Sequence, residues 1–306
     1  MTLRALYDVP APAKINLFLH VTGQRADGYH LLQSVFALID WTDTLHFEVR
    51  DDGALARHDL GPALPADDLC LRAARALQAG SGTPLGADIS ILKHVPWGAG
   101  MGGGSSDAAT TLLALNRLWG LHWPRGRLAA LGLSLGADVP FFVGGHNALV
   151  EGIGERLTPM RLQASRYAIV KPPVEIPTRD IFAHPLLKRD TKADIVTGSL
   201  EGTGLIGWPA AWGAENAGPD ETLEAFGHND LQAAAQDRCP EVAQAARWLQ
   251  ARYGNSRMTG SGSAVFARVG TETPPMATLP ADELPPGWVG RMCRSLVAHP
   301  LLGWAG

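Results

Sequence analysis

The feature that most constrains this chain is a glycine-rich stretch at residues 96–107, which reads Pro-Trp-Gly-Ala-Gly-Met-Gly-Gly-Gly-Ser-Ser-Asp. Five glycines in seven residues allow positive φ angles and a close approach of the backbone to a ligand. The stretch follows a strand pattern at residues 87–93 and precedes a run with helical spacing that ends near Gly120. A helix N-terminus, capped by Ser105 or Ser106, would offer free N–H groups to an anion. The sequence therefore predicts a phosphate-binding loop that opens a helix.

The composition of the chain limits the classes of protein to which it can belong. A chain of 306 residues with 46% apolar content is long enough for one large domain or two compact ones. The net charge is −4, and the 26 basic and 30 acidic residues form no runs, which argues against a broad surface for nucleic acid or an anionic membrane. Three distant cysteines and the lack of a long apolar run indicate a reduced, soluble, cytoplasmic protein without a targeting segment.

The rest of the pattern mixes strands and helices without a fixed repeat. Apolar alternation predicts strands at residues 13–21, 44–49, 147–151, 166–171 and 264–267. Helical spacing predicts helices at residues 67–79 (ending at Gly80), 127–133, 230–237 and 240–253. A second glycine loop is expected at 256–263, an irregular insertion at 188–219, and no regular helix in the proline-rich segment 274–286.

A few polar side chains stand out against this pattern. Lys14 and Asn16 fall on the second, mixed face of the first strand, opposite its apolar residues; a lone lysine there is usually solvated, and Asn16 beside it favours a ligand contact. Asp138 lies in an apolar context, so it either caps a turn or helix or sits in a partly desolvated cleft suited to proton chemistry. His30, taken alone, indicates a structural role.

Two common phosphate-loop motifs fit the glycine stretch poorly. Gly98, Gly100 and Gly103 have the spacing of the dinucleotide fingerprint, but no acidic residue follows about 20 positions later to hold a ribose. The Walker A motif requires a lysine where Gly104 precedes Ser105. A flexible linker is a weaker interpretation, because linkers do not follow a strand and open a capped helix.

Four further blocks carry a specific resemblance. The glycine stretch resembles the phosphate loop of the galactokinase, homoserine kinase, mevalonate kinase and phosphomevalonate kinase (GHMP) superfamily. Together with it, PAKINLFL, GQRADGYH, LGADVPFF and TGSG, at residues 12–19, 23–30, 135–142 and 259–262, resemble one family within it, the 4-(cytidine 5′-diphospho)-2-C-methyl-D-erythritol kinases.

The resemblance implies ATP-dependent transfer of the γ-phosphoryl group to the 2-hydroxyl of the erythritol moiety of that small-molecule substrate, a step of the non-mevalonate (MEP) route to isoprenoid precursors. It implies Lys14 and Asp138 as the catalytic pair. Asp138 would take or orient the hydroxyl proton, and Lys14 would keep the Asp138 carboxylate ionised. Ser105 or Ser106 could offer an oxygen to Mg²⁺, and no other protein ligand to a metal is predicted. The expected ATP-binding residues are Pro96, Trp97, Gly98, Ala99, Gly100, Met101, Gly102, Gly103, Gly104, Ser105 and Ser106.

The resemblance also implies a substrate pocket and a fold. The pocket is expected from Asn16, Tyr29, His30, Thr178 and Phe182, with Tyr29 and His30 meeting the cytosine by stacking and hydrogen bonds. The fold would be α+β, with a mixed-sheet ATP-binding domain of the ribosomal protein S5 domain 2 type at residues 1–158 and an α/β sandwich domain at 159–306. The active site would lie between the two domains.

The sequence leaves alternatives open. One alternative keeps the kinase activity and changes the substrate, so that another GHMP kinase would act on mevalonate, homoserine or a sugar. A non-catalytic nucleotide-binding relative would be expected to lack Lys14 or Asp138, and both are present. Asp68 stands where many relatives have asparagine, so a contact of that side chain with adenine is in question. Relatives have a helix after the strand at 264–269, but this segment is rich in proline here, so the structure of the C-terminal layer is also in question.

Overall fold

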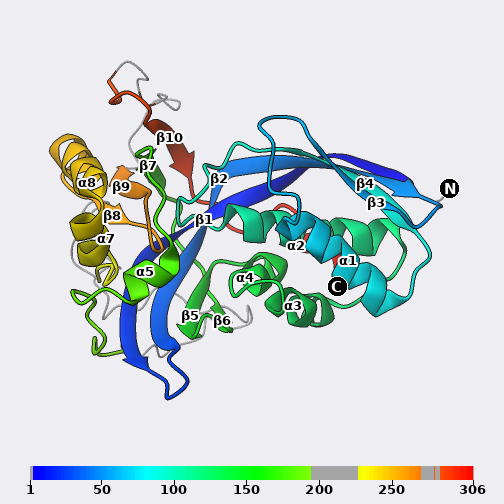
Figure 1. The fold of residues 1–306 in the computed structure, drawn as a ribbon, viewed down its shortest axis with the longest axis horizontal. Helices are drawn as coiled ribbons and strands as arrows, with labels where there is room; N and C mark the ends of the chain where they lie inside the picture. Colours follow the sequence, from blue (N-terminus) through cyan, green and yellow to red (C-terminus); the bar gives the residue numbers. More distant parts are fainter. Residues whose placement is uncertain (1–2, 194–226, 270–278, 280–282, 306) are drawn as a thin grey trace.

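The fold consists of two β-sheets that meet near the middle of the molecule, each covered by helices (Figure 1). The structure is a computed structural model, and it describes residues 3–193, 227–269, 279 and 283–305. The predicted insertion at 188–219 and the proline-rich segment at 274–286 lie for the most part outside the described residues. Among the described residues, no helix combines the length and the apolar content needed to cross a bilayer.

The first sheet is built around a long antiparallel pair, β1 (Ala5–Gln24) and β2 (His30–Arg50). β2 lies at the centre of the strand order β3-β4-β2-β5-β6. The β3–β4 pair is parallel and the other pairs are antiparallel, so the sheet is mixed, as the family resemblance implies. The remaining strands are β3 (Leu55–Asp59), β4 (Gly86–Leu92), β5 (Ala148–Gly152) and β6 (Arg156–Pro159).

Four helices pack against this sheet: α1 (Leu69–Ser81), α2 (Gly103–Leu118), α3 (Arg125–Leu133) and α4 (Val139–Gly144). α2 is the central one, because twelve of its side chains are buried and it contacts β1, β2 and the other three helices. Two predicted helix ends are wrong. The N-cap of α2 is Gly102 and not a serine, and α1 continues past Gly80 to a left-handed cap at Gly82.

The second sheet has the order β10-β7-β9-β8, with all three pairs antiparallel. Helices α7 and α8 cover it on the side away from the first sheet (Figure 1). The elements are β7 (Arg166–Lys171), α5 (Thr178–Phe182), α7 (Gln232–Arg238), α8 (Pro240–Tyr253), β8 (Arg257–Met258), β9 (Val265–Val269) and β10 (Val289–Arg294).

The C-terminal segment returns to the first half of the chain. Leu301 and Ala305, on either side of the 3₁₀ helix η2 (Leu302–Trp304), are buried in the core beneath the first sheet. The Arg125 guanidinium donates to the carbonyl oxygens of Leu302 and Ala305 and so fixes this end. The sheet changes between Pro159 and Arg166, and a domain boundary after residue 158 stays a prediction.

The second face of the first strand is mixed in composition, as predicted, but the solvated environment expected for a lone lysine on that face is wrong. Every residue from Ala11 to Val21 is buried, including Lys14, Asn16 and Phe18. The reason is that β1 lies between two layers: one core joins β1 and β2 to the second sheet, and α2 packs on β1 as well. Alternation along a strand cannot reveal a second covering layer when polar side chains take part in it.

Candidate active site

In the glycine-rich loop, glycines with positive φ angles alternate with buried side chains. Gly98, Gly100 and Gly102 have φ angles of 62°, 73° and 70°, in the left-handed region that favours glycine. Between them, Ala99 and Met101 are buried in the core that joins the two sheets. The two buried side chains therefore fix the loop to the core between its glycine turns.

A second glycine-rich segment supports the loop from behind. Ser263 N donates to Gly98 O at 3.1 Å, and Ala264 N donates to Ala99 O at 3.2 Å. A Cβ atom on Gly260 would lie 2.7 Å from Gly100 O, so the two backbones pack directly on each other. The sequence singled out both glycine segments, but it gave no sign that they touch.

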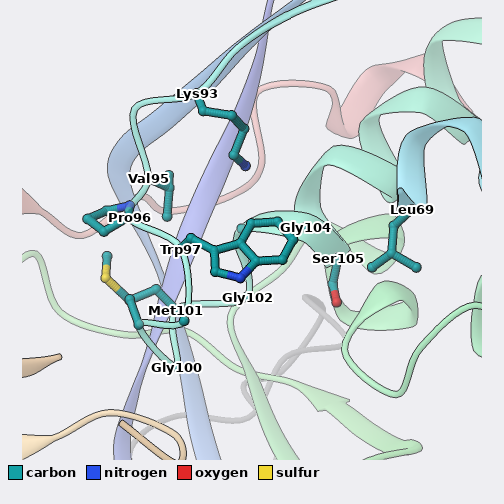
Figure 2. A pocket seen from close by; sticks show the side chains of 13 residues that line it. Leu69, Lys93, Val95, Pro96, Trp97, Gly100, Met101, Gly102, Gly104 and Ser105 are labelled. Carbon is teal, nitrogen blue, oxygen red and sulfur yellow. The ribbon is translucent and has the colours of Figure 1, made fainter. Parts of the chain in front are cut away.

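A cavity of about 310 Å³ opens in front of the loop (Figure 2). Ten of the eleven residues predicted to bind ATP line it, from Pro96 to Ser105. Ser106 does not line it, because its side chain is buried and its hydroxyl donates to Pro12 O at 2.7 Å. The first turn of α2, whose N–H groups have no acceptor within the helix, begins at the cavity wall. The cavity can therefore hold an anionic group.

Lys14 and Asp138 form an ion pair beside the loop. Lys14 Nζ lies 3.6 Å from Asp138 Oδ2 and donates to Asn16 Oδ1 at 2.7 Å. Its backbone N–H donates to Met101 O at 3.0 Å, which ties β1 to the glycine loop. Lys14 is only 3% exposed, whereas the Asp138 side chain is 31% exposed. Asp138 precedes α4 and makes no side-chain cap hydrogen bond, so of the two alternatives the structure favours the cleft.

The ammonium group of Lys14 is held in an apolar setting. It lies 4.4 Å from the centre of the Phe36 ring, and burial lowers the pKa of Lys14 while the Asp138 charge opposes that shift. A Cβ atom on Gly102 would lie 3.3 Å from Lys14 Cε, so the glycine leaves room for this side chain. The cation is thereby placed between the loop and the carboxylate.

Asn16 serves mainly to hold Lys14. Its side chain is buried, and its Nδ2 donates to Ser34 Oγ at 2.9 Å while its Oδ1 accepts from Lys14. Its backbone N–H donates to Thr259 Oγ1 at 3.0 Å, which links it to the second glycine segment. A direct contact of Asn16 with a substrate stays a prediction.

The other predicted substrate residues gather around α5. The His30 and Phe182 rings stack with centroids 4.9 Å apart and an interplanar angle of 25°. Thr178 Oγ1 lies 2.7 Å from Ser261 Oγ, so α5 is joined to the second glycine segment. Tyr29 is 61% exposed at the turn between β1 and β2. The structure therefore brings His30, Phe182 and Thr178 to one region and leaves Tyr29 at its solvent edge.

Known proteins match this chain along its whole length. The family model described as "GHMP kinases N terminal domain" matches residues 68–146, and "GHMP kinases C terminal" matches residues 217–275. A relative from Methylibium petroleiphilum, named 4-diphosphocytidyl-2-C-methyl-D-erythritol kinase, is 65% identical over 309 residues, which cover 100% of both chains.

The chain belongs to the 4-diphosphocytidyl-2-C-methyl-D-erythritol kinase family. A relative of the same name from Variovorax paradoxus is 54% identical over 306 residues and covers 99% of this chain and 100% of its own. A crystal structure titled 4-(cytidine 5′-diphospho)-2C-methyl-D-erythritol kinase matches with a TM-score of 0.71 and 32% identity, over 93% of this chain and 98% of that one. The predicted α+β GHMP-kinase fold is confirmed.

The sequence missed three residues that line the cavity of this family member: Leu69, Lys93 and Val95. Asp68, next to Leu69, caps α1 through Leu71 N at 3.1 Å and pairs with Arg57 at 3.0 Å. The position of Lys93, at the end of a predicted strand and three residues before the loop, could have indicated a role in binding. This position points to a binding residue only when the strand is known to end at a cavity.

Lys93 is held between two buried carboxylates, Asp43 and Asp107. Asp43 also accepts from the backbone N–H groups of His94 and Val95, at 2.6 and 2.8 Å. Asp107 Oδ1, by contrast, has no hydrogen-bond partner within the part of the chain that the structure describes. Burial raises the pKa of Asp107 well above its usual value, and the Asp43 charge adds to this against the opposing effect of Lys93.

This cluster predicts how stability depends on pH. A carboxyl group whose pKa is raised on folding stabilises the folded protein below its unfolded pKa, and this contribution is lost as the pH rises. Asp107→Asn should therefore flatten the decline of the unfolding free energy above about pH 4, measured by urea unfolding at a series of pH values. The exposed Asp67→Asn is the control and should follow the wild type. Parallel profiles for Asp107→Asn and wild type would contradict the assignment.

Proposed function

We propose that this protein transfers the γ-phosphoryl group of ATP to the 2-hydroxyl of 4-diphosphocytidyl-2-C-methyl-D-erythritol. The observation that most strongly supports this proposal is the Lys14–Asp138 ion pair, whose charged groups lie 3.6 Å apart next to the glycine loop. The names of relatives up to 65% identical support the acceptor, and membership of a kinase family implies ATP as the phosphoryl donor.

Asp138 is the group that meets the acceptor hydroxyl. Its carboxylate is partly exposed while Lys14 is buried behind it, so the substrate reaches Asp138 first. Asp138 orients the hydroxyl and accepts its proton as the oxygen attacks phosphorus. Lys14, fixed by Asn16, stabilises the ionised carboxylate and the charge that develops on the transferred group. The glycine loop and the first turn of α2 hold the β- and γ-phosphates.

Mg²⁺ fits the donor groups beside the cavity. Ser105 lines the cavity, and a Cβ atom on Gly136 would lie 3.8 Å from Ser105 Oγ, so this hydroxyl faces the turn that carries Asp138. Among the described residues no three His, Cys, Asp or Glu side chains form a metal cluster, which suits an ion held largely by phosphate and water. Bound there, Mg²⁺ would neutralise phosphate charge, with Ser105 as its protein ligand.

The cytidyl end of the substrate is assigned to the region around α5. His30 and Phe182 provide stacked aromatic surface, Tyr29, the residue before His30, provides an exposed ring, and Thr178 provides a hydroxyl. Stacking of a base on an aromatic ring contributes about 1–3 kcal/mol. The division of the chain after residue 158, a cytoplasmic location and the lack of a nucleic-acid partner stay predictions from the sequence.

A coupled assay for ADP release tests the proposal. The purified protein, with ATP and Mg²⁺, should release ADP in the presence of 4-diphosphocytidyl-2-C-methyl-D-erythritol, and phosphorus NMR of the product should place the new phosphate on the 2-hydroxyl. Mevalonate, homoserine and galactose form the comparison panel and should give no more than background. Faster turnover with a member of this panel would overturn the choice of acceptor, and ATP binding without turnover of any acceptor would favour a non-catalytic role.

A further inference from the structure

Arg189, which no sequence motif singles out, lies beside the aromatic pair of His30 and Phe182. Its Nε donates to His30 Nε2 at 3.1 Å, and its Nη2 donates to Phe182 O at 2.9 Å. The guanidinium also donates to Leu187 O at 3.1 Å and His184 O at 3.3 Å. One side chain therefore binds the histidine ring, the end of α5 and the turn that follows it.

The bonding pattern of Arg189 is unusual for an arginine. All four acceptors are neutral, and no carboxylate among the described residues lies within ion-pair distance of it. Arginine has a rigid planar set of five N–H donors, which suits it to fixing several acceptors at once.

The contact defines the state of the His30 ring. Because Nε2 accepts a hydrogen bond from a cation, the ring proton of neutral His30 is on Nδ1. Burial lowers the pKa of His30, and the Arg189 charge lowers it further, so the ring is neutral at pH 7. His30 Nδ1 makes no hydrogen bond to any residue that the structure describes.

We propose that Arg189 is a positioning residue of the cytidyl site, which holds His30 as the Nδ1–H tautomer with its ring stacked on Phe182. The inference rests on the proposed function, since it takes this aromatic pair to receive the base. A surface that is already ordered binds more tightly, because fewer side-chain motions are lost on binding. Without Arg189 the ring can rotate away from Phe182 and adopt either tautomer.

Kinetics with matched variants test the proposal. Arg189→Met should raise the KM for the cytidyl substrate about tenfold, which corresponds to about 1.4 kcal/mol of binding free energy, because the binding surface is no longer ordered in advance. The KM for ATP and kcat should change by less than about twofold, since Arg189 does not reach the Lys14–Asp138 pair. Arg189→Lys, which keeps the charge but not the fork, should recover part of the affinity.

The control is Arg238, which also binds α5. Arg238 Nη2 donates to Asp180 Oδ2 at 2.7 Å, and the side chain makes no contact with His30. Arg238→Met should leave the KM for the cytidyl substrate unchanged. An equal rise in KM in both variants, or no rise in Arg189→Met, would overturn the positioning role.

A spectroscopic measurement decides the tautomer without any turnover. Two-bond ¹H–¹⁵N spectra of ¹⁵N-histidine-labelled protein report which ring nitrogen carries the proton, and His30→Gln identifies the signal. The wild type should show the proton of His30 on Nδ1, and Arg189→Met should show a mixture. A wild-type ring protonated on Nε2 would refute the inference even if the kinase assay succeeds. If the kinase assay fails, only the proposed function is lost, and these spectra still decide the state of His30.

Discussion

Asp138→Asn is expected to lower kcat by roughly 10²- to 10⁴-fold, the usual contribution of a positioned general base. Asparagine has nearly the same size, but it cannot accept the hydroxyl proton or pair with Lys14, which now lies 3.6 Å from the carboxylate. The KM for ATP should change little, because the nucleotide cavity is lined by residues of the loop and not by Asp138. Steady-state kinetics with varied ATP and varied acceptor measure both quantities.

The same substitution should leave the fold intact. Asp138 makes no side-chain cap hydrogen bond, and its side chain is partly exposed. The melting temperature should fall moderately, because the buried ammonium group of Lys14 loses its counter-charge, but the protein should still fold cooperatively. Asp51→Asn, on an exposed carboxylate paired with Arg4, is the matched control and should keep full activity. Wild-type kcat in Asp138→Asn would remove Asp138 from the mechanism.

Gly100→Ala is expected to cause the largest loss of stability among single substitutions in the loop. A Cβ atom at this position would lie 2.3 Å from Thr259 O and 3.1 Å from Gly262 N, and both neighbours are backbone atoms that cannot rotate away. The φ angle of 73° adds strain for any residue other than glycine. Together these effects should lower the unfolding free energy by about 2–5 kcal/mol and raise the KM for ATP, because the loop must shift toward the cavity.

Gly126→Ala provides the control for Gly100→Ala. Gly126 lies in α3 with no atom within 4 Å of a built Cβ and has no positive φ angle. Alanine there should stabilise the helix by about 0.5–1 kcal/mol and leave the KM for ATP unchanged. Urea unfolding and ATP titration of the two variants give the comparison. Equal stability of Gly100→Ala and wild type would show that the two glycine segments separate readily.

Local rules predicted much of this structure from the sequence. The strand, glycine loop and helix at residues 86–118 follow from alternation, glycine content and helical spacing, each of which acts over a few residues. The resemblance of four short blocks then drew attention to Lys14 and Asp138, which are 124 positions apart in the chain and form an ion pair in the structure. Motifs located these residues, and the structure provided their geometry.

The features that the sequence missed depend on contacts between distant segments. Burial of both faces of β1 requires the second sheet, and the roles of Lys93 and Arg189 require partners at Asp43, Asp107 and His30. Strands β3, β6 and β10 are stabilised by their neighbours, so a short stretch alone gives little signal. Contacts between distant segments produce no regular spacing of apolar residues, so they cannot be predicted from the sequence pattern.

The close contact of the two glycine segments also limits how such a protein can be recombined. The wall of the nucleotide cavity is formed by residues 96–105, but its shape depends on Gly260 and on the N–H groups of Ser263 and Ala264. A chimera that joins the first half of this chain to the second half of a distant relative would keep every cavity-lining residue and could still lose the shape of the loop. The two glycine segments therefore form one structural unit, even though separate family models match the two halves of the chain.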